Sequence, residues 1–120
     1  MRKAAAGQGA APSGAIDLAH LERATFDDRA LRREVLSLFQ RQAATLGAEL
    51  AQVDSDKARA DIAHRLRGAA LGVGAMAVAE AAAAFERAPE NAAQLAEALV
   101  RLAVSIAEAR AAAREIIGGD

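Results

Sequence analysis

Apolar residues recur every three or four positions along most of this chain, and this spacing constrains its fold more than any other feature. It is clearest between Leu31 and Val53, where it places the apolar side chains on one face of an α-helix of about seven turns. The predicted inward positions are Leu31, Val35, Leu38, Phe39, Gln42, Leu46, Leu50 and Val53. No stretch of the sequence alternates apolar and polar residues as a half-buried β-strand does. The pattern therefore predicts an all-α protein.

Three further segments have the same spacing, and residues typical of helix ends separate them. These boundary residues are Asp27 or Asp28, Asp54-Ser55-Asp56, Gly72 and Gly74, Pro89, Asn91 with Gln94, and Gly118-Gly119. The predicted inward residues of the three segments are Ala58, Ile62, Leu66, Ala69 and Val73, then Met76, Val78, Ala81, Ala82 and Phe85, and finally Leu95, Leu99, Leu102, Ile106, Ala109, Ala113 and Ile116. Because the connections are short, we expect antiparallel neighbours. The sequence thus predicts an up-down-up-down four-helix bundle in a single domain over residues 16–118.

The N-terminal part of the chain has a different composition. Residues 1–15 are rich in Ala, Gly, Gln, Pro and Ser and are predicted to be a flexible tail, because such a segment cannot bury enough apolar surface to fold. A short additional helix is predicted from Ile16 to Leu21, with these two residues directed inward. Phe26, in the connection that follows, is predicted to anchor this helix to the bundle.

Composition excludes several classes of function. The chain contains no cysteine, so it forms neither disulfides nor cysteine-based zinc sites. Its net charge of −1 gives no general attraction to nucleic acid or to a membrane surface. No apolar run is long enough to span a bilayer, and no apolar segment follows Met1-Arg2-Lys3 as it would in a secretory signal. We therefore expect a cytoplasmic protein that binds neither nucleic acid nor membrane.

A histidine and a glycine one turn apart in the third predicted long segment form the strongest candidate site. Within a helix Gly68 costs about 1 kcal/mol relative to alanine, a residue that this chain uses freely elsewhere. At about 100° per residue, His64 lies opposite the inward residues Ile62 and Leu66 and is predicted to face solvent. Its predicted neighbours on that surface are Lys57, Ala60, Asp61, Arg67, Gly68 and Leu71.

The residue types around His64 suit the transfer of a phosphoryl group. Imidazole is largely uncharged near pH 7, so an exposed ring nitrogen can attack phosphorus. The bound phosphoryl group then carries about two negative charges, and the Arg67 guanidinium can bind two of its oxygens. Gly68 lacks the Cβ that would hold a partner's active site away from His64. Asp61 is expected to pair with Lys57 or Arg65.

Simpler explanations exist for most of these residues. A lone histidine on a polar helix face is usually a solvated side chain, and we interpret His20 in this way because neither a cation nor a glycine follows it one turn later. Gly72 and Gly74 are explained as residues that end a helix. Solvation alone would also explain His64, but it does not explain Gly68.

The segment from His64 to Ala75 resembles the signature of the histidine-containing phosphotransfer (HPt) domains of multistep two-component signalling. That signature has histidine, any residue, an aliphatic residue, lysine, glycine, two small residues and then a Gly-Ala pair. The corresponding residues here are His64, Arg65, Leu66, Arg67, Gly68, Ala69, Ala70 and Gly74-Ala75. Arg67 replaces the usual lysine, and Ala69 replaces the usual serine. The resemblance covers nearly all of the chain after residue 15.

This resemblance implies that His64 accepts a phosphoryl group from the phospho-aspartate of one receiver domain and passes it to the aspartate of another. Arg67 would stabilise the phosphoryl group, and Gly68 would provide clearance for the receiver. No cofactor is implied on this chain, because the Mg²⁺ belongs to the receiver, and no kinase activity of its own is implied. The implied partners are response-regulator receiver domains and a hybrid histidine kinase, and the implied state is a monomer. Candidate receiver contacts are Ser37, Gln40 and Arg41.

Other classes of function remain open. The dimerisation and phosphoacceptor module of a sensor histidine kinase normally has an acidic residue directly after its histidine and Thr or Asn one turn later, where this chain has Arg65 and Gly68. A non-catalytic helical adaptor would use the surface around the glycine for docking, without covalent chemistry. A metalloprotein is the weakest alternative, because the two histidines lie far apart and no paired carboxylate motif accompanies them.

Overall fold

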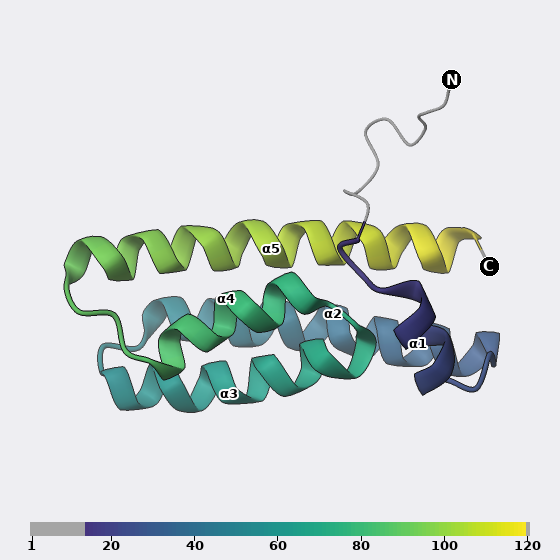
Figure 1. Cartoon of the computed structure of the whole chain (residues 1–120), viewed down its shortest axis with the longest axis horizontal. Helices are drawn as coiled ribbons and strands as arrows, with labels where there is room; N and C mark the ends of the chain where they lie inside the picture. The colour runs from purple at the N-terminus through teal and green to yellow at the C-terminus, as the bar shows by residue number, and fades with distance from the viewer. Residues whose placement is uncertain (1–13, 120) are drawn as a thin grey trace, which may run out of the picture.

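The computed structural model describes residues 14–119, and within them it contains five α-helices and no β-strand (Figure 1). The helices are α1 (Leu18–Ala24), α2 (Arg29–Gln52), α3 (Asp56–Val73), α4 (Met76–Glu86) and α5 (Ala92–Gly119). The predicted all-α class is confirmed. Of the predicted tail over residues 1–15, residues 1–13 lie outside the described part of the chain.

Side chains cap these helices at positions that the sequence predicts. Asp28 caps α2 and Ser55 caps α3, each by accepting a hydrogen bond at 3.1 Å from the backbone N–H three residues later. Before α5, the side chain of Asn91 accepts a hydrogen bond from the N–H of Gln94 at 2.8 Å. The Gln94 side chain in turn accepts one from the N–H of Glu90 at 2.9 Å. These two reciprocal hydrogen bonds resemble a capping box.

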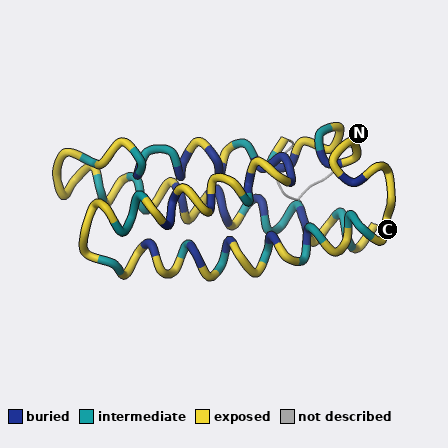
Figure 2. Tube along the Cα trace, turned by 90° about the horizontal axis from the view of Figure 1, so that it is seen from below, coloured by how far each residue is buried: buried dark blue, intermediate teal, exposed yellow. Residues whose placement is uncertain are grey.

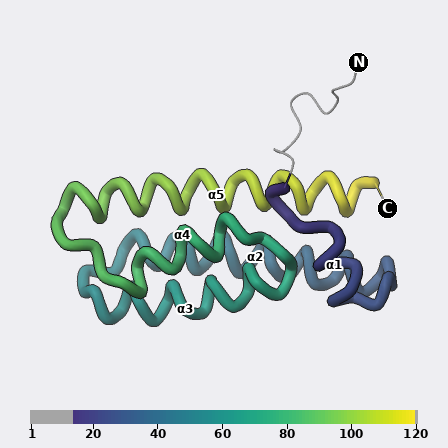
Figure 3. The backbone as a smooth tube through the Cα atoms, in the orientation of Figure 1, coloured from purple at the N-terminus to yellow at the C-terminus, as the bar shows by residue number. Residues whose placement is uncertain are grey.

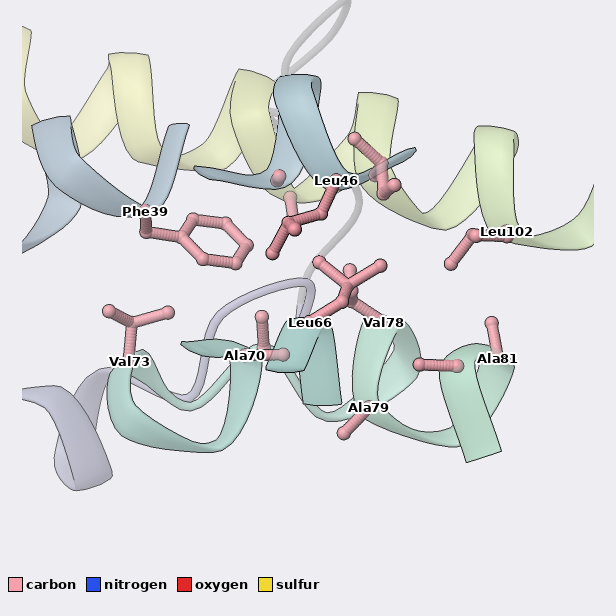
Figure 4. Close-up of a cluster of buried hydrophobic side chains, with 14 of the residues drawn as sticks. Phe39, Leu46, Leu66, Ala70, Val73, Val78, Ala79, Ala81 and Leu102 are labelled. Atoms are coloured by element: carbon pink, nitrogen blue, oxygen red, sulfur yellow. The ribbon is translucent and has the colours of Figure 1, made fainter. Parts of the chain in front are cut away.

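Helices α2 to α5 lie side by side, and successive helices run in opposite directions (Figure 1, Figure 3). Helix α3 packs against α2 and α4, α5 packs against the same two helices, and α1 lies against α3. Phe39 and Leu46 of α2 and Leu102 of α5 point toward Leu66 of α3 and Val78 of α4 (Figure 4). Buried residues therefore line the inner sides of the helices, while their outer sides are exposed (Figure 2).

The buried face of α2 is rotated relative to the predicted face. Its buried residues are Leu36, Phe39, Ala43, Leu46 and Leu50. Leu38 and Gln42, both predicted to point inward, are exposed, with 46% of Leu38 accessible. The rotation arises because α2 contacts α5 as well as α3. Gly47 lies at this second contact, since a Cβ there would be 2.9 Å from Cδ1 of Ile106. The prediction relied on the spacing of large apolar residues, and this spacing does not reveal a helix contact made through small residues such as Gly47.

The predicted short helix corresponds to α1, and Ile16 and Leu21 are buried as predicted. Phe26, however, does not anchor this helix, because 83% of the residue is exposed. Its backbone adopts a positive φ of 55°, which turns the chain toward α2 and leaves the ring outside. Thr25 is buried in its place, and its hydroxyl donates a hydrogen bond to the carbonyl of Leu21 at 2.8 Å.

Gly74 ends α3 in the left-handed conformation, with a φ of +82°. Its carbonyl accepts a hydrogen bond from the N–H of Asp17 at 2.9 Å, which joins the end of α3 to the start of α1. A Cβ on Gly74 would lie 3.0 Å from the carbonyl oxygen of Asp17. Gly72 differs, because it lies inside α3, is exposed, and has no atom beyond its local helical surroundings within 4 Å of a Cβ. Of these two glycines, only Gly74 ends the helix.

We predict that Gly74→Ala lowers the free energy of unfolding by about 1–3 kcal/mol, because the substitution strains a left-handed residue beside Asp17. Gly72→Ala should instead raise it by up to about 1 kcal/mol, because alanine is the better residue in an open helical position. Urea unfolding followed by circular dichroism measures both changes. Equal effects of the two substitutions would contradict these different roles.

Candidate functional site

His64 lies in the middle of α3 and points away from the core. The buried side chains of Ala63 and Leu66 fix the rotation of this part of the helix. As a result, 76% of the His64 side chain is exposed, in agreement with the spacing in the sequence. A ring in this position is accessible to a partner molecule.

Glu86, the last residue of α4, contacts two candidate residues of the site, His64 and Arg67. Its Oε1 lies 3.1 Å from Nδ1 of His64, and its Oε2 lies 3.3 Å from Nη1 of Arg67. The Glu86 side chain is 24% exposed, whereas that of Arg67 is 44% exposed. One carboxylate therefore bridges the histidine and the arginine, and it leaves the second ring nitrogen, Nε2, outside this contact.

Glu86 was not predicted as a neighbour of His64, although the sequence contains a signal for it. Helices α3 and α4 run in opposite directions on the two sides of the turn at Gly74 and Ala75. His64 and Glu86 lie at nearly equal distances along the chain from this turn, so an antiparallel helical hairpin places them at the same level. Pairing residues across the predicted turn would have identified Glu86 as a neighbour of His64.

Gly68 lies one turn after His64 on the outer surface of α3. No atom beyond its local helical surroundings lies within 4 Å of the position that a Cβ would occupy. Alanine would therefore fit without a clash and would favour the helix by about 1 kcal/mol. Nothing in the described structure accounts for a glycine here. A glycine at this position thus weakens the helix, and the space beside it on the outer surface is unoccupied.

Other residues singled out in the sequence have local roles. Asp61 forms an ion pair with Lys57 at 3.2 Å, as predicted, and both side chains are largely exposed. The amide of Gln40 donates a hydrogen bond to the carbonyl of Arg110 at 3.1 Å, which ties α2 to α5. Gln40 is therefore directed toward α5.

Ser37 and Arg41, two predicted receiver contacts, line a shallow and open depression on α2. Leu38 lines the same depression and is one of the exposed apolar side chains of this helix. On α3, Leu71 is also exposed, one turn after Arg67. Apolar surface is therefore available both on α2 and near the candidate site on α3.

No protein-family model, curated protein or solved structure matches this chain. Among residues 14–119, no group of three or more His, Cys, Asp or Glu residues is arranged to hold a metal ion. None of the described helices combines the length and the apolar character needed to cross a membrane.

We predict that Gly68→Ala raises the free energy of unfolding by about 1 kcal/mol, because the position is helical and unobstructed. Gly47→Ala is the matched control, since its added Cβ would meet Ile106 and offset the same gain in helix propensity. Urea unfolding of both variants measures the difference. If Gly68→Ala proves less stable than Gly47→Ala, Gly68 has a structural role within the fold.

Proposed function

We propose that this chain is a phosphorelay intermediate that accepts a phosphoryl group on His64 from a receiver-domain phospho-aspartate and passes it to another receiver domain. In the first step a nitrogen of His64 forms a bond to phosphorus, and the bond from phosphorus to the aspartate oxygen breaks. The second step reverses these changes on a different aspartate. The observation that supports this function most strongly is an exposed histidine one turn from a glycine that the fold does not require.

The finer description of the fold belongs to the same proposal. We propose an up-down-up-down four-helix bundle of α2 to α5, preceded by the short helix α1, as one domain over residues 16–118. Two observations support it: the contacts of these four helices form a closed ring, and successive helices run in opposite directions. A rigid helical scaffold of this kind suits a protein that presents one reactive side chain to several partners.

Arg67 is proposed to stabilise the phosphorylated form. Its guanidinium is partly exposed and lies on the side of α3 that carries His64, with Glu86 in contact with both residues. A guanidinium binds phosphate oxygens in pairs, so Arg67 can take the place of the usual lysine and offer a second hydrogen bond.

Gly68 is proposed to provide the clearance that a receiver needs to reach His64. The acceptor aspartate of a receiver must approach within bonding distance of a phosphoryl group on the ring. No bulky side chain can therefore project from the helix beside the ring. The partners in this proposal are receiver domains of response regulators and a hybrid histidine kinase. Any Mg²⁺ is carried by the receiver, and the chain acts as a monomer in the cytoplasm.

A non-catalytic docking module is the second candidate function. It is favoured by the exposed Leu71, which adds apolar surface beside Arg67 and Gly68. Such a module would bind a partner through the same face of α3 but would carry no phosphoryl group. Phosphotransfer experiments separate the two functions.

We predict that the 120-residue chain takes up acid-labile label from phosphorylated receiver domains and that His64→Ala abolishes this uptake. His20→Ala is the matched control, because His20 is the other histidine of the chain and is predicted to retain full uptake. Labelling is followed by gel electrophoresis at alkaline pH. Undiminished labelling of His64→Ala, or no labelling of the wild type by any receiver of a broad panel, would contradict the proposed function.

We predict that Gly68→Leu slows transfer from a receiver by at least about tenfold, a loss of roughly 1.4 kcal/mol of transition-state stabilisation. Uptake from phosphoramidate, a small donor that needs no docking, should remain as in the wild type. Rates from the two donors, measured on the same preparation, isolate the steric effect. Equal slowing with both donors would show that Gly68 does not act through clearance.

A further inference from the structure

Helix α5 has a second apolar face, on the side away from the core. Val100 and Val104 lie one turn apart on this face, and 64% and 51% of the two residues are exposed. Exposed alanines surround them, and together the six residues form the outer α5 face: Ala93, Ala96, Val100, Ala103, Val104 and Ala107. We propose that the outer α5 face binds an amphipathic helix of a partner protein.

The fold does not account for valine at these two positions. Valine is a poorer helix former than alanine, and it gains little from burial here because both residues are mostly exposed. Isolated exposed apolar residues are common on protein surfaces, but a helix that is apolar on opposite faces normally packs against other elements on both. The outer α5 face therefore has the composition of a helix contact, although no described part of the chain covers it.

Two charged residues lie along one edge of the outer α5 face. Glu97 and Arg101 are exposed and one turn apart, beside Val100 and Val104. Within residues 14–119, neither of their side chains forms a hydrogen bond or an ion pair. A partner helix with a cation and a carboxylate one turn apart at the edge of its apolar face can pair with both. Its cation would face Glu97, and its carboxylate would face Arg101.

A second copy of this chain fits the outer α5 face poorly. If the valines of two copies meet with the helices antiparallel, the two Arg101 side chains also meet, and if the helices are parallel, the two Glu97 side chains meet. Like charges that face each other across a helix contact are destabilising. Residues 1–13 are no better suited, because they contain no acidic residue for Arg101 and Met1 is their only large apolar residue. The charges therefore favour a helix from another protein.

The outer α5 face and His64 lie on different sides of the bundle. Helices α3 and α5 each contact α2 and α4, and they lie at opposite edges of the bundle (Figure 1). A helix bound to α5 therefore leaves the exposed ring of His64 accessible. This surface can hold the chain on a partner while the candidate site stays open, and its binding of a helix does not depend on phosphorylation of His64.

The first test asks whether the fold uses the two valines. We expect Val100→Ala and Val104→Ala to unfold at the same urea concentration as the wild type or at a higher one, because alanine is the better helix former. Val78→Ala is the control that should lower the midpoint, since Val78 is fully buried. Circular dichroism follows the unfolding. A lower midpoint in Val100→Ala or Val104→Ala would show that the valines support the fold, and it would overturn the proposal.

The second test uses two designed helical peptides with identical apolar faces. One peptide carries its edge charges in the order Glu-x-x-x-Lys, and the other carries them in the order Lys-x-x-x-Glu. We expect the wild-type chain to bind one of them at least about fivefold more tightly, because only one order pairs with both Glu97 and Arg101. The exchange variant Glu97→Lys/Arg101→Glu should reverse this preference. NMR titration measures the affinities, and the shifted amide signals should centre on Val100 and Val104.

Lysine substitutions locate the contact. Val104→Lys should weaken binding of the preferred peptide by at least about tenfold, because it places a charge within the apolar contact. Leu18→Lys is the matched control and should bind as the wild type does, since Leu18 is 52% exposed but lies on α1.

Three results of the binding test would overturn the proposal: no saturable binding of either peptide, equal binding of both by the wild type, or equal losses in the two lysine variants. Sedimentation of the wild-type chain tests the second copy as occupant. We expect a single monomeric species, whereas self-association that Val104→Lys abolishes would assign the outer α5 face to a dimer and overturn the proposal.

Discussion

The packing of α3 against α4 is the interaction on which the rest of the structure depends. It is the most extensive contact between helices in the described chain. Buried alanines on both helices keep the side chains small, so the two backbones can approach closely. The same hairpin is joined to α1 through the hydrogen bond between Asp17 and Gly74. Close packing of the two helices fixes the positions of residues on α3 relative to residues on α4.

The candidate site is a product of this packing. An exposed pair of charges contributes about 0–1 kcal/mol to stability, so the contacts among His64, Arg67 and Glu86 do little to hold the fold together. The fold instead brings the Glu86 carboxylate from α4 to side chains on α3. Gly68 itself weakens α3, and because it has no side chain it leaves the surface of α3 open at this position. The candidate residues His64, Arg67 and Gly68 therefore lie together on the outer surface of α3, where they take no part in the packing of the core.

Local signals in the sequence predicted the helices and the exposure of His64. The caps at Asp28, Ser55 and Asn91 depend on hydrogen bonds over a few residues. The residue types therefore identified Asn91 and limited the other two caps to Asp27 or Asp28 and to Asp54-Ser55-Asp56. The outward direction of His64 follows from the helical period and from large neighbours such as Leu66. These features require no knowledge of how the helices are placed relative to one another.

Three features that depend on how the chain packs were wrong or missed. The buried face of α2 includes Ala43, which an alanine-rich chain does not distinguish from its exposed alanines. Phe26 was wrongly predicted to anchor the short helix to the bundle, whereas the backbone conformation turns its ring outward. The contact of Glu86 with His64 was missed because it forms between α3 and α4 and belongs to no local motif.

We propose that a ring nitrogen of His64 carries the phosphoryl group. The most direct measurement is the ³¹P NMR spectrum of the full chain after phosphorylation by a receiver domain. We predict one phosphoramidate resonance with the shift of a phosphohistidine, which disappears in acid and is absent from His64→Ala. A resonance that persists in His64→Ala, or no phosphoramidate resonance with any phosphorylated receiver, would contradict the proposal.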